Sequence, residues 1–288
     1  MPRPEPRPLT WRGLWVEVQS ALGSSLDARR IVERASGYDG AELLLHLEEG
    51  VPTRAVGFVQ RMVERRRNGE PLQYVLGRWG FRRLDLLVDR RVLIPRPETE
   101  VVVDAVLVEL NRLGLDGSPV IVDLGTGSGA IALSVADEVA RAQVWATDSS
   151  AEALAVARAN LAGLGSQAAT RVRLAQGHWF EALPEELRGR IDVLVSNPPY
   201  VADDEDLPDE IAAWEPARAL FAGPTGLEAF VEILAEAAPW LSRPGALVLE
   251  VAPHQASAIV RLAREAGLAD ADARPDLQGR LRVVVARV

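Results

Sequence analysis

A short glycine-rich segment, DLGTGSG at residues 123–129, has the residue types of a loop that binds a nucleoside-containing cofactor. Its glycines lie between a predicted strand and a predicted helix, so the backbone can pass close to a ligand while N–H groups at the helix start stay free. The spacing matches G-x-G-x-G, and Ala130 at the sixth position of a dinucleotide fingerprint is an allowed variant. A tight turn that only packs the helix on the strand is the alternative. The candidate cofactor-binding residues here are Gly125, Thr126, Gly127, Ser128 and Gly129.

An acidic residue, Asp148, ends the next predicted strand, 25 residues after Asp123. A carboxylate there can accept hydrogen bonds from both hydroxyls of a ribose. We expect Asp123 and Asp148 both at the mouth of the site, where acidic surroundings disfavour a nucleotide phosphate and favour a cationic sulfonium with a free ammonium. Residues 120–140 contain no basic residue, and the chain contains no lysine. These features favour S-adenosylmethionine over NAD, although Asp148 by itself could be an ordinary helix-cap aspartate.

The most specific motif is SNPPY at residues 196–200, which follows the predicted strand IDVLV. Tandem prolines cannot continue a central strand, and Pro198 keeps Asn197 out of the helical region. The loop is therefore stiff, and it presents the Asn197 side-chain oxygen and a backbone carbonyl beside the Tyr200 ring. Two fixed acceptors and an aromatic face suit a planar –NH2 group. Such a nitrogen is a poor nucleophile, and holding it in line with an activated methyl group supplies proximity and electrostatic help. A rigid turn without a ligand is the alternative.

Composition excludes several other kinds of chemistry. All 32 basic residues of the 288-residue chain are arginines, there is no cysteine, and the three histidines are far apart. Schiff-base and phosphate-loop lysines, thiolate nucleophiles, disulfides and cysteine-ligated metals are therefore excluded, and no metal site is expected. The longest run without a charge, residues 124–136, is too short to span a bilayer, and we recognise no secretory signal. We therefore expect a cytoplasmic protein with no membrane partner.

The elements that must position these residues change character along the chain. After a proline-rich start that we expect to be disordered, residues 11–67 have apolar side chains at helical spacing and predict four or five short helices. Residues 71–95 predict an extended or hairpin connector. From residue 96 strands and helices alternate, which predicts a mostly parallel sheet covered on both faces. Strands are expected at 119–124, 143–148, 171–175, 191–196, 246–252 and 281–288, and helices at 129–140, 150–163, 226–241 and 255–267.

Charge is spread unevenly over these parts. Residues 1–95 hold 16 arginines against 12 acids, a net charge of +4, whereas residues 96–288 hold 16 arginines against 29 acids, a net charge of −13. The asymmetry indicates two units with different duties. A drift of surface composition without functional meaning is the alternative.

Taken together, these motifs resemble the peptide chain release factor glutamine-N5 methyltransferases, the HemK/PrmC-like family. RPETE ahead of the glycine motif, combined with NPPY, is highly specific to this group. The resemblance covers nearly the whole chain through PLQYVLG (71–77), LIPRPETE (93–100), DLGTGSGAIAL (123–133), SNPPYV (196–201), EPARAL (215–220) and QGRLRVVV (278–285).

The resemblance implies an α/β fold of the class I S-adenosylmethionine-dependent methyltransferases, Rossmann-like, with a mostly parallel seven-stranded sheet. It implies a helical substrate-docking domain at 1–75, a hairpin connector at 76–95 and a methyltransferase domain at 96–288. The implied reaction is methylation of the glutamine in the Gly-Gly-Gln motif of release factors, and we expect a monomer. By position, the substrate-binding and catalytic residues are Asn197, Pro198, Pro199 and Tyr200. The implied cofactor-binding residues are Gly125 to Gly129, Asp148, Asn197 and Trp179, with Trp179 against the adenine.

Four positions depart from the family pattern. His178 stands before Trp179, where an aspartate that could accept the adenine amine is usual. Ala222 and Thr225 replace glycine and aspartate in a turn, and Ala252 replaces a common glycine. These departures put the strength of the activity in question but not its kind.

Three alternatives remain beside this interpretation. An adenine-N6 methyltransferase of nucleic acid would use the same pair of acceptors, but DDEDLPDE at 203–210 places six acids directly after the motif and would repel a polyphosphate. Glutamine methylation of a ribosomal protein shares the chemistry. A non-catalytic adaptor in translation is motivated by the four departures, and the intact Asn197, Pro198, Tyr200 and Asp148 weigh against it.

Overall fold

The computed structural model describes residues 9–288, and most of the proline-rich start, residues 1–8, lies outside them. The chain divides into two compact units. One contains the residues up to Gly77 together with Asp209–Trp214, and the other contains Arg78–Pro208 and Glu215–Val288. Within the described residues, no helix has the length and apolar character needed to cross a membrane.

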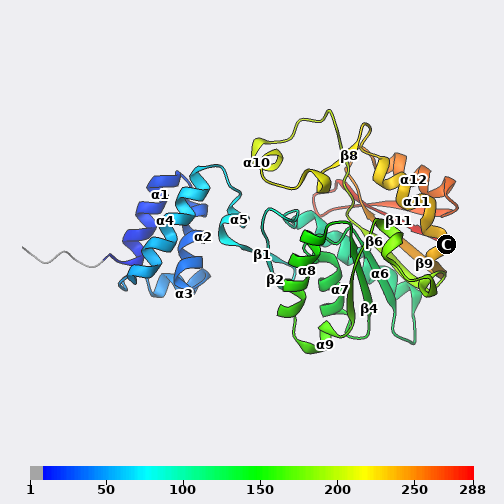
Figure 1. The fold of residues 1–288 in the computed structure, drawn as a ribbon, viewed down its shortest axis with the longest axis horizontal. Helices are drawn as coiled ribbons and strands as arrows, with labels where there is room; N and C mark the ends of the chain where they lie inside the picture. The colour runs from blue at the N-terminus through cyan, green and yellow to red at the C-terminus, as the bar shows by residue number, and fades with distance from the viewer. Residues whose placement is uncertain (1–8) are drawn as a thin grey trace, which may run out of the picture. The chain divides into compact units, whose positions relative to one another are not determined.

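The first unit is a bundle of short helices, as the periodicity of residues 11–67 predicts (Figure 1). Of the apolar positions at helical spacing, the structure buries Leu14, Val18, Val59 and Met62 but leaves Leu44 and Leu45 exposed. Side-chain caps begin the first two helices, since the Thr10 and Ser24 hydroxyls accept backbone N–H groups. The helices are α1 (Trp11–Leu22), α2 (Ser25–Ser36), α3 (Gly40–Leu45), α4 (Thr53–Arg67), α5 (Leu72–Leu76) and α10 (Asp209–Ala212).

The expected connector contains an antiparallel hairpin, β1 (Arg78–Phe81) and β2 (Leu84–Leu87). The prediction that all of 71–95 is extended or hairpin was wrong at its start, where Leu72–Leu76 forms α5. Four of these five residues are buried. A short apolar run of this kind does not distinguish a strand from a buried helical turn, and tertiary packing decides between them.

The second unit is built on a seven-stranded sheet, which confirms the predicted α/β class. The strand order is β10-β11-β9-β6-β3-β4-β5, and β9, β6, β3, β4 and β5 pair in parallel while β11 pairs antiparallel with both of its neighbours. The six predicted strands are present, and β10, whose polar sequence DADARP lies at the sheet edge, was not predicted. The strands are β3 (Val120–Leu124), β4 (Gln143–Asp148), β5 (Val172–Gln176), β6 (Ile191–Ser196), β9 (Leu241–Glu250), β10 (Asp270–Pro275) and β11 (Leu281–Arg287).

Helices cover both faces of this sheet (Figure 1). Neighbouring residues of one strand serve opposite faces: Val193 packs with the core under α6 and α7, and Leu194 packs with the core under α11 and α12. The strands are therefore apolar on both sides, as buried parallel strands must be. Helix α6 was not predicted. The long helices are α6 (Glu100–Leu113), α7 (Ala130–Glu138), α8 (Ala151–Gly163), α11 (Glu228–Trp240) and α12 (Ala256–Glu265).

Short elements connect the strands and helices of the second unit. Four of them, η1, η2, η4 and β8, carry residues of the candidate site described below. They are η1 (Pro97–Thr99), α9 (Ser166–Ala169), η2 (Trp179–Ala182), η3 (Glu185–Leu187), β7 (Val201–Ala202), η4 (Ala217–Ala219) and β8 (Phe221–Gly223).

A buried carboxylate ties the far edge of the sheet to helix α6. The Glu109 side chain accepts hydrogen bonds from Arg287, Arg274 and Arg112. Burial alone would raise the pKa of Glu109, but the bonds from these arginines outweigh burial and lower it to about 2. Glu109 is thus a satisfied structural acid.

Candidate active site

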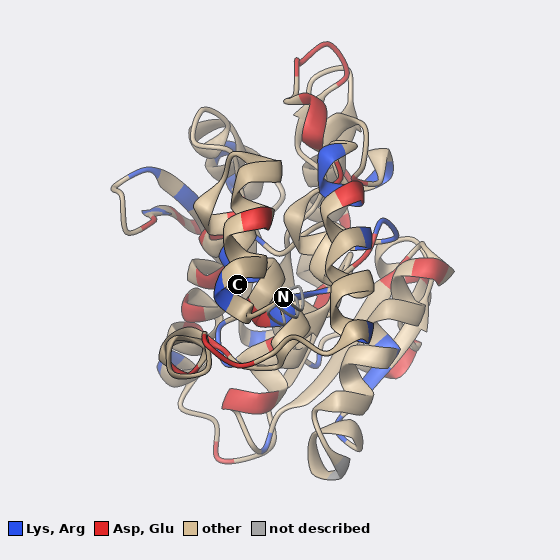
Figure 2. Ribbon diagram, turned by 90° about the vertical axis from the view of Figure 1, so that its left-hand side faces the viewer, with Lys and Arg blue, Asp and Glu red and all other residues tan. Residues whose placement is uncertain are grey.

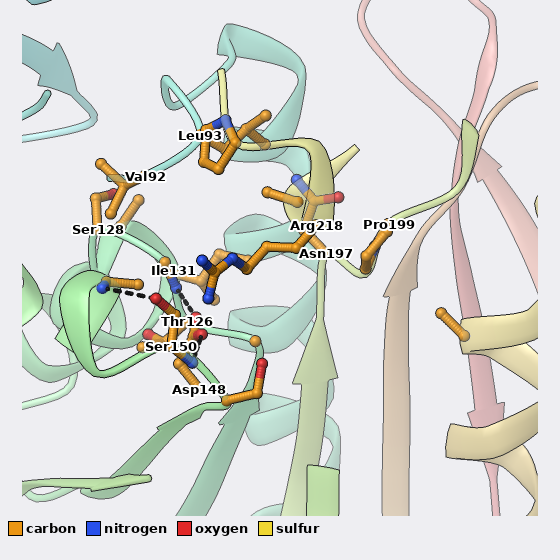
Figure 3. A pocket seen from close by; sticks show the side chains of 18 of the residues that line it. Val92, Leu93, Thr126, Ser128, Ile131, Asp148, Ser150, Asn197, Pro199 and Arg218 are labelled. Atoms are coloured by element: carbon orange, nitrogen blue, oxygen red, sulfur yellow. Dashed lines mark hydrogen bonds between the residues drawn. The ribbon is translucent and has the colours of Figure 1, made fainter. Parts of the chain in front are cut away.

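A cavity of about 410 Å3 opens beyond the carboxyl ends of β3, β4 and β6 (Figure 3). This is where open parallel sheets bind their ligands, and the volume is that of a cofactor site. Its walls come from the loops after these strands, from residues 91–99 and from residues 216–222. Of the predicted site residues, the cavity lining includes Gly125, Thr126, Gly127, Ser128, Asp148, Trp179, Asn197 and Pro199, but not Gly129, Pro198 or Tyr200.

The glycine loop folds over the end of β4 through backbone hydrogen bonds. The N–H groups of Gly125 and Thr126 both donate to the Thr147 carbonyl, at 2.9 and 2.8 Å. Gly125 has φ +74°, and a Cβ there would contact the Trp179 ring at 3.4 Å. Gly129 does not line the cavity; it directly precedes α7, and a Cβ there would lie 2.9 Å from Leu133 Cδ1. The third glycine therefore serves helix packing, whereas the first lets the backbone line the cavity.

The Asp148 carboxylate lies in the cavity wall and is held by backbone donors. Its Oδ2 accepts from Gly127 N at 2.9 Å and its Oδ1 accepts from Ser150 N at 2.8 Å. Burial raises the pKa of Asp148 above its ordinary value, although both N–H donors and the charge of Arg218 oppose that change. Each carboxylate oxygen keeps a further lone pair, so the group remains able to accept from a ribose.

Asp123 does not reach the cavity mouth, contrary to the sequence-based expectation. It lies buried beneath the loop, where Oδ2 accepts from Thr126 Oγ1 at 2.6 Å and from Ala132 N at 3.2 Å. Within residues 9–288, its Oδ1 has no hydrogen-bond partner. Burial raises the pKa of Asp123 to about 7, against the lowering effect of these two bonds. Asp123 therefore supports the loop from below and does not face a ligand.

A further wall of the cavity combines Trp179 with the Glu232 carboxylate of α11. Trp179 has φ +43°, and its Nε1 donates to Glu232 Oε2 at 2.6 Å. His178 Nε2 lies 3.0 Å from the same oxygen. Glu232 lines the cavity, so an acid stands beside position 178 in space although the sequence has histidine there. The sequence did not predict Glu232 because it lies 54 residues after His178, on the exposed face of α11.

The Asn-Pro-Pro-Tyr loop continues β6 at the opposite side of the cavity from the glycine loop (Figure 3). Gln255 Nε2 fixes it by donating to the carbonyls of Tyr200, at 2.9 Å, and Gly226, at 3.1 Å. Pro198 is buried, and Tyr200 is partly buried against the core under α11 and α12. Burial raises the pKa of Tyr200 to about 12. The phenol therefore stays neutral, and the ring helps to anchor the loop.

Behind Asn197 lies a small polar cluster that the sequence did not reveal. Asn197 Nδ2 donates to Thr99 Oγ1 at 3.4 Å, and Glu250 follows Leu249, the residue of β9 that pairs with Ser196. Thr99 and Glu250 are both buried. The available signals were Thr99 in the RPETE motif and Glu250 at the end of the predicted strand 246–252.

Two arginines line the cavity, although residues 120–140 contain none. Arg91 is paired with Asp89 through two hydrogen bonds of 2.8 and 2.5 Å. Arg218, from the EPARAL motif, extends into the cavity toward the end that holds Thr126 and Asp148 (Figure 3). The expectation of purely acidic surroundings was therefore wrong, because distant segments supply the cations.

The remaining departures from the family pattern are accommodated locally. Ala222 lines the cavity, and Thr225 donates from its N and its Oγ1 to Glu228 Oε1, at 2.9 Å each, ahead of α11. Among the described non-glycine residues only Arg82 and Trp179 have positive φ, so Ala252 adopts a conformation that alanine tolerates. Within the described part of the chain, no group of three or more His, Asp or Glu residues could hold a metal ion.

The donor set fits S-adenosylmethionine: an acid for the ribose, close backbone at the glycine loop, and an aromatic wall. Sheet order, cavity position and these groups define a class I methyltransferase, whose methyl donor is S-adenosylmethionine. Two family models match, the Methyltransferase small domain at residues 105–214 and the PrmC N-terminal domain at residues 19–77.

Curated relatives extend the match to most of the chain. A release factor glutamine methyltransferase of Cereibacter sphaeroides is 40% identical over 91% of this chain and 90% of its own length. One from Moorella thermoacetica is 43% identical over 91% of this chain and 90% of its own. This chain belongs to the release factor glutamine methyltransferase family. A methyltransferase structure from Pyrococcus furiosus shares the fold with a TM-score of 0.50 and 22% identity, covering 71% of this chain and 88% of that one.

Proposed function

We propose that this protein transfers a methyl group from S-adenosylmethionine to the side-chain amide nitrogen of the glutamine in the Gly-Gly-Gln motif of a peptide chain release factor. The observation that carries the proposal is that Asn197 and the glycine loop line one cavity. A group held by the Asn-Pro-Pro-Tyr loop therefore lies next to whatever the glycine loop and Asp148 hold.

S-adenosylmethionine supplies a methyl group on a cationic sulfonium, and the electron pair of the broken C–S bond stays on sulfur. Asn197 Oδ1 and the Pro198 carbonyl accept the two N–H bonds of the glutamine amide and aim its nitrogen. As the N–C bond forms, positive charge develops on that nitrogen, and one of its protons leaves by way of the acceptor oxygens to water at the cavity mouth. Fixed acceptors stabilise this charge without a strong base.

Asp148 and the glycine loop bind and orient the cofactor in this proposal. The carboxylate is already held by Gly127 N and Ser150 N, so little reorganisation is needed when a ribose arrives. Trp179, fixed by Glu232, offers a flat surface for the adenine.

We further infer that residues 1–75 dock the release factor. Helix α4 carries exposed Arg54, Arg61 and Arg67, and residues 1–95, which include the hairpin connector, carry a net charge of +4. Changing Arg61 and Arg67 together to Glu should raise the KM for the full-length factor several-fold and leave the KM for a short Gly-Gly-Gln peptide unchanged. The control is Arg141→Glu, because Arg141 precedes β4 at the amino ends of the strands, opposite the cavity at their carboxyl ends. If the double variant and the wild type had equal KM values for the full-length factor, these arginines would not dock it.

We also infer that nucleic acid is not a substrate and that one chain suffices. Six of the eight residues 203–210 are among the acids coloured red in Figure 2, and this segment follows the substrate loop directly and opposes a polyphosphate. The cavity walls come from a single chain. The adaptor alternative does not account for an Asn197 side chain that is fixed by a hydrogen bond to Thr99. Because the proposed substrate is a release factor, we infer that the enzyme acts in the cytoplasm.

The test is methyl transfer from labelled S-adenosylmethionine to a purified release factor, beside a variant whose Gly-Gly-Gln is changed to Gly-Gly-Ala. Label on the glutamine-bearing factor alone is the expected result. Label on neither factor, with cofactor binding intact, would point to a ribosomal protein or to the adaptor function.

A further inference from the structure

The carboxylate of Glu232 lines the cavity, and only one of its two oxygens is bonded. Trp179 Nε1 donates to Glu232 Oε2 at 2.6 Å, and His178 Nε2 lies 3.0 Å from the same oxygen. Because a carboxylate only accepts, both rings must donate their N–H groups to it, and Oε2 then has one donor for each of its two lone pairs. Within residues 9–288 we find no hydrogen bond to Oε1. This oxygen is therefore able to accept from a ligand.

Stability does not explain why these three side chains are held together. The side chains of His178 and Glu232 are 55% and 53% exposed. Ion pairs and hydrogen bonds at such exposure contribute little to the free energy of unfolding, because water screens the charges and competes for the bonds. The arrangement does fix the direction of the carboxylate, since two donors on Oε2 leave Oε1 in one place. We therefore examine what Oε1 could bind.

The backbone places this carboxylate next to the residue that we assign to the ribose. Strands β4 and β5 pair in parallel with Asp148 opposite Gln176, and Gly177 N donates to the Asp148 carbonyl at 3.1 Å. His178 and Trp179 follow directly on Gly177, and all three line the same cavity as Asp148. The base of a nucleoside is joined directly to its ribose. A ribose bound by Asp148 therefore brings its base to the wall formed by His178, Trp179 and the acid that they hold.

This wall combines a surface that accepts any base with a group that distinguishes between bases. The Trp179 ring is a stacking surface, and stacking discriminates little because every base has a π-face. The Glu232 carboxylate does discriminate, because Oε1 accepts from an exocyclic amine and repels an exocyclic carbonyl oxygen. Adenine carries an amine at C6, whereas hypoxanthine carries a carbonyl oxygen there. The wall therefore fits adenine and disfavours its deaminated form.

We propose that Glu232 selects the adenine of S-adenosylmethionine by accepting a hydrogen bond from its exocyclic amine at Oε1, while Trp179 and His178 hold Oε2. This inference rests on the part of the proposed function in which Asp148 and the glycine loop bind the cofactor. It does not depend on which protein is methylated. It gives His178 a function as a donor that orients the acid, and it makes Glu232 a specificity-determining residue of the cofactor site.

The experiment measures the dissociation constants of S-adenosylhomocysteine and S-inosylhomocysteine by calorimetry. These ligands share the ribose and the amino acid and differ at the C6 and N1 edge of the base. The wild type should bind the adenosyl ligand about 10- to 100-fold more tightly, because a charged acceptor meets a donor in one ligand and a carbonyl oxygen in the other. Glu232→Gln has an amide that can donate to that oxygen, and it should reduce the preference by about 10-fold or more.

Glu236→Gln is the matched control. Glu236 is also an exposed glutamate of α11, four residues after Glu232, and it is not part of the cavity lining. Its removal changes the charge of the helix by the same amount, so a general effect of charge would appear in both variants. The Glu236→Gln variant should keep the ligand preference of the wild type. A preference reduced equally in the two variants would overturn the proposal.

Two other outcomes in Glu232→Gln would also overturn it. An equal loss of affinity for both ligands would mean that the carboxylate binds the ammonium group or only holds Trp179, since the ligands share the amino acid and both stack. Unchanged affinities would mean that Glu232 does not contact the cofactor. A wild type that binds neither ligand would refute the cofactor site and this inference together. The predicted preference in an enzyme that labels no release factor would support the inference and refute only the substrate.

Discussion

The two ends of the cavity are built by different means. At the cofactor end, backbone N–H groups hold the Asp148 carboxylate, and backbone bonds to Thr147 hold the glycine loop. At the amide end, side chains from separate segments hold the Asn-Pro-Pro-Tyr loop, chiefly Thr99 and Gln255. The first end depends on chain conformation, and the second depends on side-chain hydrogen bonds.

This difference predicts which measured quantity, cofactor affinity or turnover, a substitution at each end should change. A side-chain change at the cofactor end should alter cofactor affinity, because the loop geometry survives. A side-chain change at the amide end should alter turnover, because the acceptors lose their aim while the cofactor contacts remain.

The largest effect is expected for Asn197→Ala, which removes one of two amide acceptors. Turnover should fall on the order of 10²-fold or more, because the acceptor aims the nitrogen and stabilises its developing charge. Cofactor affinity should change little. Single-turnover methyl transfer and calorimetric titration with S-adenosylhomocysteine measure the two quantities. An equal loss of cofactor affinity would mean that Asn197 mainly shapes the cavity and that the two ends are not separable.

Asp148→Asn should have the opposite signature. The carboxamide has a single oxygen, so it cannot accept from both Gly127 N and Ser150 N as the carboxylate does. Its NH2 group would then face one of these two N–H groups. Loss of a charged hydrogen-bond acceptor costs about 1.5–3 kcal/mol, so cofactor affinity should fall about 10- to 100-fold. Turnover at saturating cofactor should remain within a few-fold of the wild type. A fall in turnover with unchanged affinity would contradict the division of labour.

A backbone change at the amide end should give an intermediate effect. Gly226 has φ +70°, and a Cβ there would lie 2.6 Å from the Tyr200 carbonyl oxygen and 2.9 Å from Gln255 Nε2. Gly226→Ala should displace the loop and lower turnover about 10-fold, since small misplacements of a reacting group are costly. Gly117→Ala meets no atom within 4 Å and is the matched control. Equal turnover of the two variants would show that the loop tolerates displacement.

The same difference explains what could be predicted from the sequence. The glycine loop and Asp148 lie on consecutive strands, so their proximity follows from the alternation of strands and helices. Asn197 was recognisable because two prolines fix its loop locally. Glu232 and Arg218 were not found, because contacts between residues far apart in sequence depend on how the helices and loops pack. The helical turn of α5 was missed because burial overrode a weak local pattern. Strand β10 was missed because its polar sequence at the sheet edge has little strand character.

The smallest expected effect is on the free energy of unfolding, which the buried acids Asp123 and Glu250 lower at neutral pH. Burial raises the pKa of Asp123 and of Glu250 to about 7, above their ordinary values, so the native state binds more protons than the unfolded state between about pH 4 and 7. The free energy of unfolding should therefore fall as pH rises through this window, by on the order of several kcal/mol for the two acids together, and level off above it.

Glu250→Gln should flatten part of that fall and raise Tm at pH 8. Calorimetric Tm values from pH 5 to 8 for the wild type and this variant measure the effect. Glu109→Gln is the control: its pKa is lowered to about 2, so its stabilisation is lost only as pH falls below about 4.5 and the slope above pH 5 should not change. If Glu250→Gln kept the full slope and a lower Tm, Glu250 would be a net contributor to the fold. A higher Tm with a flatter slope would mean that the buried Glu250 carboxylate destabilises the amide end of the site.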